Sequence, residues 1–417
     1  MEEKPTPKAK QSFLRRFFSA LGPGVITGAA DDDPSGIATY SIAGAQLGTS
    51  LLWMAFITWP LMGAVQMMCA RIGMVTGVGL AGALRQKFPK AVLVIISVAL
   101  LLANIINIGA DLAGMADAAQ ILTGGNFHLF VVLFAVGISY ATVYLRYYQI
   151  ARILKWLALA LAAYIITAFL VHPQWGKVLR DSFIPTMPKG KEGWETFVAI
   201  FGTTISPYLF FWQASQEVEE EKAMGRRLLV RRENATQREI VDRMIDVGTG
   251  TFFSNLVMFF IILTTALTLH AHGVTHIETS KEAAQALGPL AGEWAMMLYT
   301  IGIIGVGLLA IPTLSGSAAY AFAETFQWGH GLDQHFKQAL EFYAVILLST
   351  LCGVVMNFLH VNAIQALFWS AVINGALAPF LMLGIFLVAR DNRIMKGQPS
   401  SRLNQVVVVV TILVMFG

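Results

Sequence analysis

The sequence predicts an all-α polytopic membrane protein. Of its 417 residues, 56% are hydrophobic and only 13% are charged, and the mean hydropathy is +0.63. A soluble domain carries roughly 25% charged residues, so this chain has too few charges to cover a surface in water. Its apolar residues gather in runs close to the ~20 residues that a helix needs to cross the hydrocarbon. The two cysteines, Cys69 and Cys352, lie inside such runs, which argues against a disulfide framework or a zinc cluster.

About eleven membrane-spanning helices are expected. The first ten lie at about 18–48, 50–72, 91–121, 127–145, 152–172, 194–216, 246–269, 293–323, 339–358 and 362–389. The eleventh, at 404–417, is short, and the sequence leaves open whether Gly417 is its native end. Residues 1–17 form a polar N-terminal segment rather than a cleavable signal peptide, because the first apolar run is far longer than the core of a signal.

Basic residues predict the orientation. The N-terminal segment and the even-numbered connections carry most of them, including Arg15, Arg16, Arg85, Lys87, Lys90, Arg146, Arg152, Lys155, Arg226, Arg227, Arg231, Arg232, Arg390, Arg393 and Lys396. The other side carries only Lys177, Arg180, Lys189, Lys191 and Lys281. Cytoplasmic loops hold the excess of Lys and Arg, so the N-terminus is expected in the cytoplasm. The basic cluster at 226–239 reads as a topology anchor, with contact to anionic lipid as the alternative.

Two of the spans are interrupted by polar residues and a proline. The first interruption is DDDPSG at 31–36, and the second is TTISPY at 203–208. Proline removes a backbone donor and disfavours helix in the residue before it. Interrupted segments in corresponding places of two halves indicate an inverted-repeat transporter whose site lies at the breaks. The halves are expected at 18–172 and 194–389, as a 5+5 repeat with helices 1 and 6 broken.

Span 3 holds further polar residues, Asn104, Asn107, Asp111 and Asp117. Carboxylates inside a membrane are costly, and by default they face a partner or a water path. The sequence alone gives equal weight to such a role and to a position near the outer end of the span. Asn374 in span 10 reads equally well as a site residue or as an interhelical hydrogen bond.

At this point the sequence resembles a known family. GPGVITGAADDDPSGIATYS resembles the first-helix signature of Nramp divalent-metal transporters, GPG…DPGN, and FGTTISPYLFFWQ resembles their sixth-helix signature, GATIMPHNLYLH. RIGMVTGVGLAGALRQKFP and NIGADLAGMADAA add to the likeness. The resemblance implies the leucine-transporter-type fold in a prokaryotic plasma membrane. It also implies a metal bound midway across the membrane, between broken helices 1 and 6.

The departures from the family pattern bear on the ligand set. Asp33 matches the family's aspartate, but Gly36 stands at the asparagine and Ser206 at the methionine. The two histidines of the sixth helix fall on Tyr208 and Gln213. The acid of DLAE is replaced by glycine in DLAG at 111–114, and span 9 lacks the family's arginine.

These losses favour a hard, partly hydrated ion. A thioether suits transition metals, so replacing it by a hydroxyl leaves an oxygen site. Mg²⁺ keeps several waters and is held by one or two carboxylates, whereas Ca²⁺ needs six to eight oxygens. The pattern is similar to the Nramp-related magnesium transporters, a prokaryotic branch of the family. The residues expected around the ion are Asp33, Ser206, Gly36, Tyr208, Gln213, Asn374, Thr203 and Asp32, with Asp31 and Thr204 close by.

The predicted function is therefore uptake of Mg²⁺, and of Mn²⁺ with it, by alternating access. Proton coupling is not expected, because the acid, histidines and arginine of the usual path are absent. The alternative within the fold is a proton-coupled Mn²⁺/Fe²⁺ transporter with an unusual site, and a trivalent cation is a distant third. Amino-acid/Na⁺ symport is disfavoured because Asp31, Asp32 and Asp33 would repel a carboxylate substrate. An enzyme is not expected, nor are a bound cofactor or nucleic acid, and the oligomeric state stays open.

Overall fold

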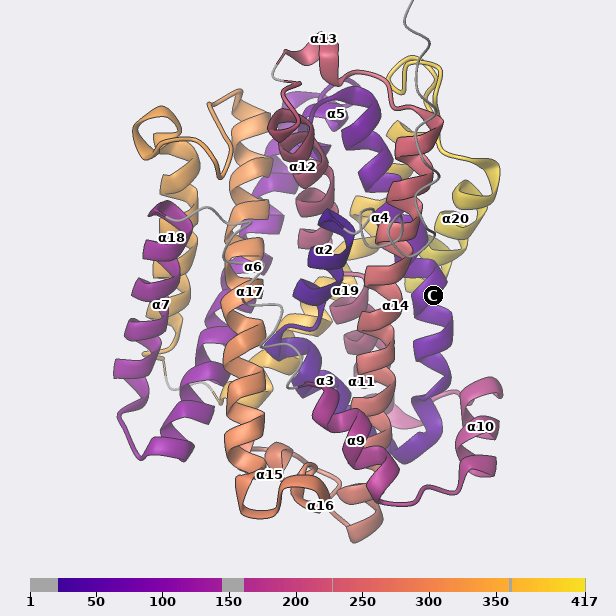
Figure 1. Ribbon diagram of the computed structural model, residues 1–417, viewed down its shortest axis with the longest axis vertical. Coiled ribbons are helices and arrows are strands. Elements are labelled where there is room, and N and C mark those ends of the chain that lie inside the picture. The colour runs from indigo at the N-terminus through magenta and orange to yellow at the C-terminus, as the bar shows by residue number, and fades with distance from the viewer. Residues whose placement is uncertain (1–21, 145–160, 227, 360–361, 417) are drawn as a thin grey trace, which may run out of the picture.

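The computed structural model describes residues 22–144, 161–226, 228–359 and 362–416, and every regular element within these ranges is a helix (Figure 1). The predicted N-terminal segment 1–17 lies outside the described residues. So do residues 152–160 of the fifth predicted span, of which α9 (Ala162–Leu170) is the described part.

Long helices lie where the sequence predicts spans. Their bounds are α2 Pro23–Asp31, α3 Pro34–Leu47, α4 Trp53–Thr76, α6 Lys90–Thr123, α7 Phe127–Tyr144, α11 Gly190–Thr204, α12 Pro207–Ala223, α14 Gln237–Thr268, α17 Ala295–Phe326, α18 Leu340–Met356, α19 Ala363–Ala389 and α20 Arg402–Phe416. The connections contain the short helices α5 Leu80–Leu84, α10 Trp175–Phe183, α13 Leu229–Arg232, α15 Ser280–Gln285 and α16 Gly288–Ala291. Short 3-10 turns occur at Gly48–Leu51, His270–His272, Gly292–Trp294 and Phe336–Gln338.

Seven segments of the described chain are helical, long and apolar enough to cross a membrane: Trp53–Thr76, Lys90–Thr123, Phe127–Tyr144, Gly190–Ala223, Gln237–His272, Gly288–Phe326 and Ala363–Ala389. Two further apolar helices, α18 and α20, are shorter, with 17 and 15 residues. The first predicted span is the broken pair α2 and α3. These helices account for the predicted spans other than the fifth.

The bundle has two chemically different ends (Figure 1). One end, here called the basic end, carries the connections with α5 and α13, and the sequence there includes Arg85, Lys87, Arg226, Arg231 and Arg232. The connection 327–339 between α17 and α18 lies at the same end. The opposite end carries α10, α15 and α16.

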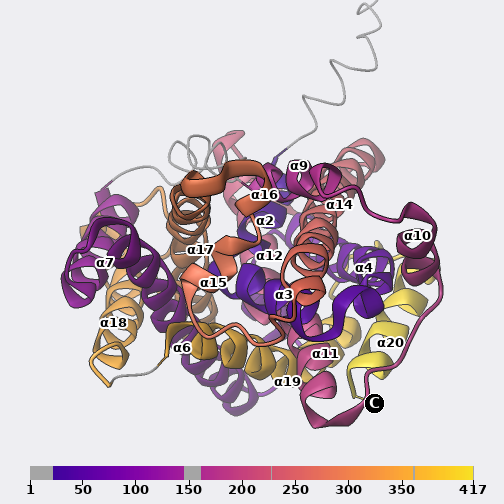
Figure 2. The same ribbon diagram turned by 90° about the horizontal axis from the view of Figure 1, so that it is seen from below.

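The two broken helices run in opposite directions at the centre of the bundle. From the basic end, α2 leads to the middle and α3 continues to the opposite end, whereas α11 and α12 run the other way (Figure 1). Seen from the opposite end, α3 lies among α6, α11, α14 and α17 (Figure 2), and it contacts all four. This antiparallel arrangement agrees with the predicted inverted repeat, and its boundaries at 18–172 and 194–389 stay a prediction.

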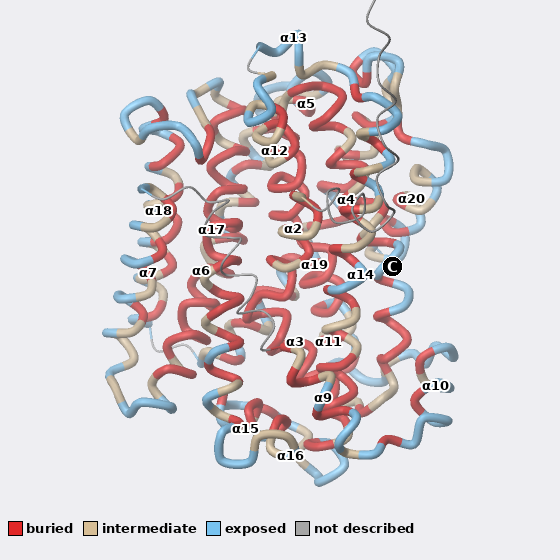
Figure 3. Tube along the Cα trace, viewed as in Figure 1, coloured by how far each residue is buried: buried red, intermediate tan, exposed pale blue. Residues whose placement is uncertain are grey.

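Burial separates this centre from the periphery. The middle of the bundle is buried, whereas α7, α10, α18 and α20 expose much of their length (Figure 3). Many of the exposed side chains on these outer helices are large and apolar, such as Leu129, Leu133, Val136, Leu351 and Leu413. Such a surface suits lipid, and the buried polar residues of the interior include those at the two breaks.

Both breaks occur where the sequence places a proline. Pro34 is the first residue of α3, and the residue before it, Asp33, is extended with ψ 171°. Pro207 is the first residue of α12, and Ser206 before it is extended with ψ 132°. Proline at the first helical position and an extended residue before it are the expected geometry. The predicted interruptions at 31–36 and 203–208 are confirmed.

Glycines bring α2 against α14 backbone to backbone. A Cβ added to Gly28 would lie 2.4 Å from the carbonyl oxygen of Gly250, and one added to Gly250 would lie 2.2 Å from the carbonyl oxygen of Gly24. A Cβ on Gly24 would lie 2.7 Å from the backbone nitrogen of Val247. No side chain fits at these positions, so the short helix α2 is held along the face of α14.

We expect Gly250→Ala to destabilise the protein, because the new methyl group must push α2 off α14, and overpacking of this kind costs about 1–3 kcal/mol. Gly248, two residues earlier on α14, has open space where its Cβ would lie. Gly248→Ala is therefore the matched control and should leave the thermal unfolding midpoint in detergent unchanged. Equal midpoints for the two variants would contradict the close approach of α2 and α14.

Candidate functional site

Asp33 lies at the start of α3 with both carboxylate oxygens engaged. Its Oδ1 accepts a hydrogen bond from the backbone nitrogen of Gly36 at 2.7 Å, as an N-cap residue does. Its Oδ2 accepts one from Nδ2 of Asn107 on α6 at 3.0 Å. The side chain is almost fully buried, with 2% of its surface exposed. The fold thus fixes one carboxylate at the break, facing α6.

Asn107 joins three other side chains into one cluster. Besides Asp33, its Nδ2 lies 3.4 Å from Oδ2 of Asp111, and its Oδ1 accepts from Nδ2 of Asn374 on α19 at 3.4 Å. Within the described chain, Asp111 Oδ1 and Asn374 Oδ1 have no hydrogen-bond partner. Two carboxylates and an amide oxygen therefore lie around one shared amide at the break. The structure places Asp111 at the site rather than near the outer end of its helix.

Gly36 faces the same cluster. A Cβ built on Gly36 would lie 3.2 Å from Oγ1 of Thr203 at the end of α11 and 3.5 Å from Oδ1 of Asp33. A side chain at position 36 would therefore point between the two breaks. The Thr203 hydroxyl has no hydrogen-bond partner among the described residues. With glycine here, no side chain stands between Asp33 and Thr203, and even a single Cβ would contact both.

Ser206 and Tyr208 hold the ends of the broken helices. The Ser206 hydroxyl turns back to the carbonyls of Gly202 and Thr203, at 2.7 and 2.8 Å. The Tyr208 hydroxyl donates to the carbonyl of Ala30 in the last turn of α2, at 2.9 Å. A carbonyl freed at the end of a helix must find a partner inside a membrane, and Tyr208 supplies that partner for Ala30. The same hydrogen bond joins the second break to the first.

Asp31 and Asp32 face a different helix from Asp33. The hydroxyl of Ser254 on α14 lies 2.6 Å from Oδ2 of Asp31 and 3.3 Å from Oδ1 of Asp32. Both carboxylates are buried, and Asp31 Oδ1 has no hydrogen-bond partner among the described residues. At the second break, the hydroxyl of Thr204 at the end of α11 lies 3.2 Å from the hydroxyl of Tyr40 on α3. The structure therefore separates Asp32 from the cluster around Asp33.

Gln213 belongs to an ionic network nearer the basic end. Its Nε2 donates to Oε1 of Glu217 at 2.7 Å, and the Nε of Arg243 on α14 lies 2.8 Å from Oε2 of Glu217. Arg243 also pairs with Glu220 and Asp246. The structure thus does not bring Gln213 to the cluster around Asp33, because its neighbour one turn along α12 draws the amide away.

Asp246 fixes the start of α2. Its carboxylate accepts hydrogen bonds from the backbone nitrogens of Gly22, Gly24 and Val25, at 2.7, 2.7 and 3.1 Å. A carboxylate at a helix N-terminus satisfies orphan donors and complements the helix dipole. Asp246 supplies this cap from a separate helix, 222 residues from Gly24 in sequence.

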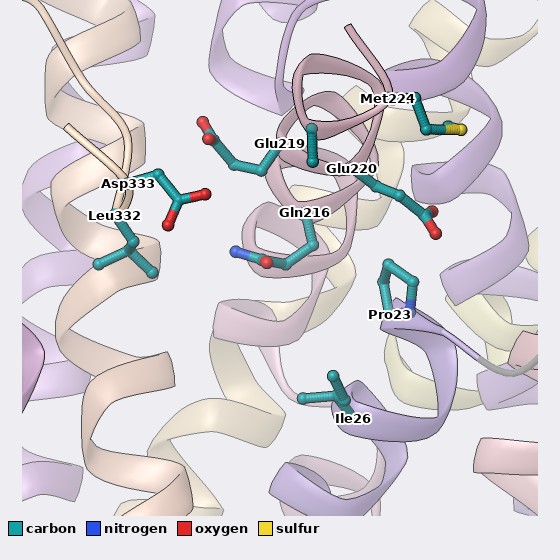
Figure 4. Close-up of a pocket in the computed structure, with 9 residues that line it drawn as sticks. Pro23, Ile26, Gln216, Glu219, Glu220, Met224, Leu332 and Asp333 are labelled. Carbon is teal, nitrogen blue, oxygen red and sulfur yellow. The ribbon is translucent and has the colours of Figure 1, made fainter. Parts of the chain in front are cut away.

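A cavity of about 320 Å³ opens at the basic end between the two broken helices (Figure 4). Pro23 and Ile26 of α2 line it on one side and α12 lines it on the other, with Leu332 and Asp333 from the connection 327–339. Its acidic lining residues are Glu219, Glu220 and Asp333. Both walls belong to helix halves that start or end at the buried breaks, and the residues that line the cavity stop short of the breaks themselves.

Sequence reasoning left the roles of Asn107 and Ser254 unassigned. Asn107 and Asp111 are four residues apart in one predicted span, so they share a helix face, and this spacing could have linked them. Nothing in the sequence points from Ser254 to Asp31, because the two residues are 223 positions apart on separate helices.

A helical bundle in which two antiparallel broken helices meet at a buried, acidic and oxygen-lined site is the architecture of a membrane transporter. Residues 24–417 match the model of the natural resistance-associated macrophage protein-like family, Nramp, and the chain belongs to this family. The family expected from the two motifs is confirmed.

Relatives and solved structures agree. The chain is 25% identical to the divalent metal cation transporter MntH of Caldanaerobacter subterraneus, over 97% of this chain and 93% of the relative. It is 28% identical to MntH of Yersinia pestis, over 73% of each chain.

In structure it resembles the Eremococcus coleocola manganese transporter, with a TM-score of 0.78 at 17% identity over 98% of this chain and 87% of that one. It also resembles Mhp1, a nucleobase-cation-symport-1 family transporter, with a TM-score of 0.57 at 15% identity over 92% and 81% of the chains. These likenesses confirm the predicted all-α, leucine-transporter-type fold. The chain is a multi-pass membrane transporter of divalent metal cations and not an enzyme.

We expect Asn107→Ala to weaken metal binding, because it removes the donor that orients Asp33 and neighbours Asp111. Asp33 is the metal ligand predicted from the sequence, and loss of a side chain that orients a ligand typically costs about 10–100-fold in affinity. Asn104 lies one turn earlier on α6 and donates to the Leu314 carbonyl and the Ser317 hydroxyl instead. Asn104→Ala is the matched control, and binding of Mn²⁺ or Mg²⁺ to purified protein by calorimetry is the measurement. Unchanged affinity in Asn107→Ala would contradict the role of Asn107.

Proposed function

We propose that this chain carries Mg²⁺, and Mn²⁺ with it, into a prokaryotic cell across the plasma membrane by alternating access. The observation that supports this most directly is the oxygen-rich cluster at the break, where Asn107 holds Asp33 and the Thr203 hydroxyl faces Gly36 without a hydrogen-bond partner among the described residues. The ion is proposed to sit there, between the broken helices, in contact with Asp33 and surrounded by neutral oxygens.

The composition of the site favours a hydrated ion. Asp33 and Asp111 are the carboxylates of the cluster, and no three His, Cys, Asp or Glu side chains converge in a metal-binding group within the described residues. Mg²⁺ is held by one or two carboxylates while it keeps several waters. The oxygens of Thr203, Asn374 and Ser206 would accept hydrogen bonds from such waters. Tyr208 supports the site through Ala30 rather than as a direct ligand.

The cavity at the basic end supports the direction of transport. Excess Lys and Arg mark the cytoplasmic side, so we place the basic end, and with it the N-terminus, in the cytoplasm. The cavity between α2 and α12 would then be the route of release. Its carboxylates, Glu219, Glu220 and Asp333, keep the route attractive for a cation.

Uptake is proposed to run without protons. The family's acid position is Gly114, where a Cβ would lie 2.9 Å from Cδ1 of Leu367, so the site of that acid is filled by an apolar side chain. The described helix α18 carries no arginine. The membrane potential supplies ~2.3 kcal/mol per charge per 100 mV, which is sufficient to draw in a divalent cation.

Proteoliposomes loaded with a metal-sensitive and a pH-sensitive dye test this proposal. Mg²⁺ should enter under a negative internal potential without acidifying the lumen, and Asp33→Ala should abolish the flux because it removes the central carboxylate. Asp181→Ala, at the opposite end and bonded to Thr49, is the control and should transport normally. Proton entry with strong preference for Mn²⁺, or near-normal flux in Asp33→Ala, would contradict the proposal.

Restoring the family pattern should change selectivity. We expect the double variant Gly36→Asn, Ser206→Met to favour Mn²⁺ over Mg²⁺. An amide and a soft thioether would then stand at the two breaks, where the family has them. The Asn Cβ requires only a small shift of the Thr203 hydroxyl, which lies 3.2 Å away. Competition of Mg²⁺ against Mn²⁺ uptake is the measurement. A selectivity equal to that of the natural chain would show that these two positions do not set it.

The second candidate is a proton-coupled Mn²⁺ transporter, and the relatives support it more directly than Mg²⁺, being named divalent metal cation and manganese transporters. The structure adds one soft donor, because Sδ of Met258 lies 3.8 Å from the Thr204 hydroxyl at the end of α11. If this thioether is used, Met258→Leu should lower Mn²⁺ uptake and spare Mg²⁺. Under the Mg²⁺ proposal both fluxes should stay unchanged.

A further inference from the structure

Asp31 and Asp32 form a cluster that the site around Asp33 does not use. Three successive carboxylates diverge at the break: Asp33 binds Asn107 on α6, whereas Asp31 and Asp32 share the Ser254 hydroxyl on α14. A hydroxyl has one proton to donate, so Ser254 can fully satisfy only one of the two carboxylates.

This second cluster is buried without a positive partner. Asp31 exposes none of its surface and Asp32 only 5%. No ion pair among the described residues involves either side chain, and Asp31 Oδ1 has no hydrogen-bond partner among them. Buried carboxylates are normally paired or bound to a metal. The free oxygen of Asp31 belongs to the same carboxyl group that contacts Ser254, so it lies beside the shared hydroxyl.

Because Asp31 and Asp32 lie at the end of α2, their need for a positively charged partner is greater. Asp31 is the last residue of the nine-residue helix α2, and Asp32 is its C-cap. The C-terminal end of a helix carries partial negative charge from unpaired carbonyls and favours cations. Two carboxylates at that end oppose the helix dipole, and a bound cation would offset both the dipole and the carboxylates.

We propose that Asp31, Asp32 and Ser254 form a second binding site for a divalent cation, separate from the one at Asp33. The ligand class follows from the donors, because two carboxylates and a hydroxyl provide hard oxygen ligands with a charge that a divalent ion balances. The inference rests on the proposed passage of divalent cations through the break. Asp31 ends α2, whose first residues line the cavity at the basic end, so an ion at this site would lie at the inner end of that helix.

Two neighbouring sites would also help release. An ion at Asp31 and Asp32 repels one at Asp33, and conduction through adjacent sites uses such repulsion to let a tightly held ion leave. The three successive aspartates in the sequence would then supply two ion-binding sites rather than one. Asp33 faces α6, and the other two face α14.

The test is the number of ions bound by the purified full-length protein, with Mn²⁺ as the probe in equilibrium dialysis and metal analysis. The natural chain should bind two ions at saturation. Asp33→Ala should keep one, and the double variant Asp31→Asn, Asp32→Asn should also keep one. Asp117→Asn, at a carboxylate bonded to the backbone of Ser280 near the opposite end, should keep both.

A milder change guards against loss of folding. Ser254→Ala should retain two ions but weaken the second about tenfold, whereas Ser349→Ala, whose hydroxyl bonds only within its own helix, should not. A single ion in the natural chain that disappears in Asp33→Ala overturns the second site and leaves the proposed function standing. Two ions in Asp33→Ala together with one in the Asp31, Asp32 variant would overturn the Asp33 site and support this one.

Discussion

A helix that breaks inside a membrane must find a partner for every peptide group that the break exposes, and this constraint organises the centre of the protein. Unpaired backbone groups in hydrocarbon each cost several kcal/mol. At the break, Asp33 caps the start of α3 and Tyr208 donates to a carbonyl at the end of α2, while at the basic end Asp246 caps the start of α2. Each cap comes from a polar side chain placed at a helix end, and two of the three cross from another helix.

This capping also determines the chemistry of the site. Because Asp33 Oδ1 is held by the backbone of Gly36 and Oδ2 by Asn107, the carboxylate cannot turn away from the space beside Thr203. The charge is oriented before an ion arrives, which lowers the entropic cost of binding. Under the proposed function, selectivity depends on the surroundings, where a glycine at position 36 and a serine bonded to the end of α11 at position 206 place no soft ligand beside Asp33.

The sequence predicted the elements well because their signals are local. Apolar length predicted the spans, and the prolines predicted breaks within 31–36 and 203–208, where Pro34 and Pro207 begin the second halves. The directions in which the side chains point were harder to predict from the sequence. Asp32 has φ −79° and ψ 50°, outside the regular helix, and this turn sends Asp33 to α6 while Asp31 and Asp32 face α14. The contacts of Gln213 were also hard to predict, because its partner Glu217 is in turn paired with Arg243 on a separate helix, α14.

The same contacts govern how the basic end can open. On one side α2 touches α14 through glycine backbones and the Asp246 cap, so the two move most easily as one unit. On the other side the cavity lies between the basic-end parts of α2 and α12, which are joined near the break by the hydrogen bond from Tyr208 to Ala30. What crosses from α14 to α12 is Arg243, paired with Glu217 and Glu220.

Arg243 and Glu217 are both largely buried, and removing one partner from a buried ion pair typically costs 3–5 kcal/mol. Glu220 also lines the cavity. If ions leave through this cavity, as proposed, they would meet the same Glu220 carboxylate that pairs with Arg243.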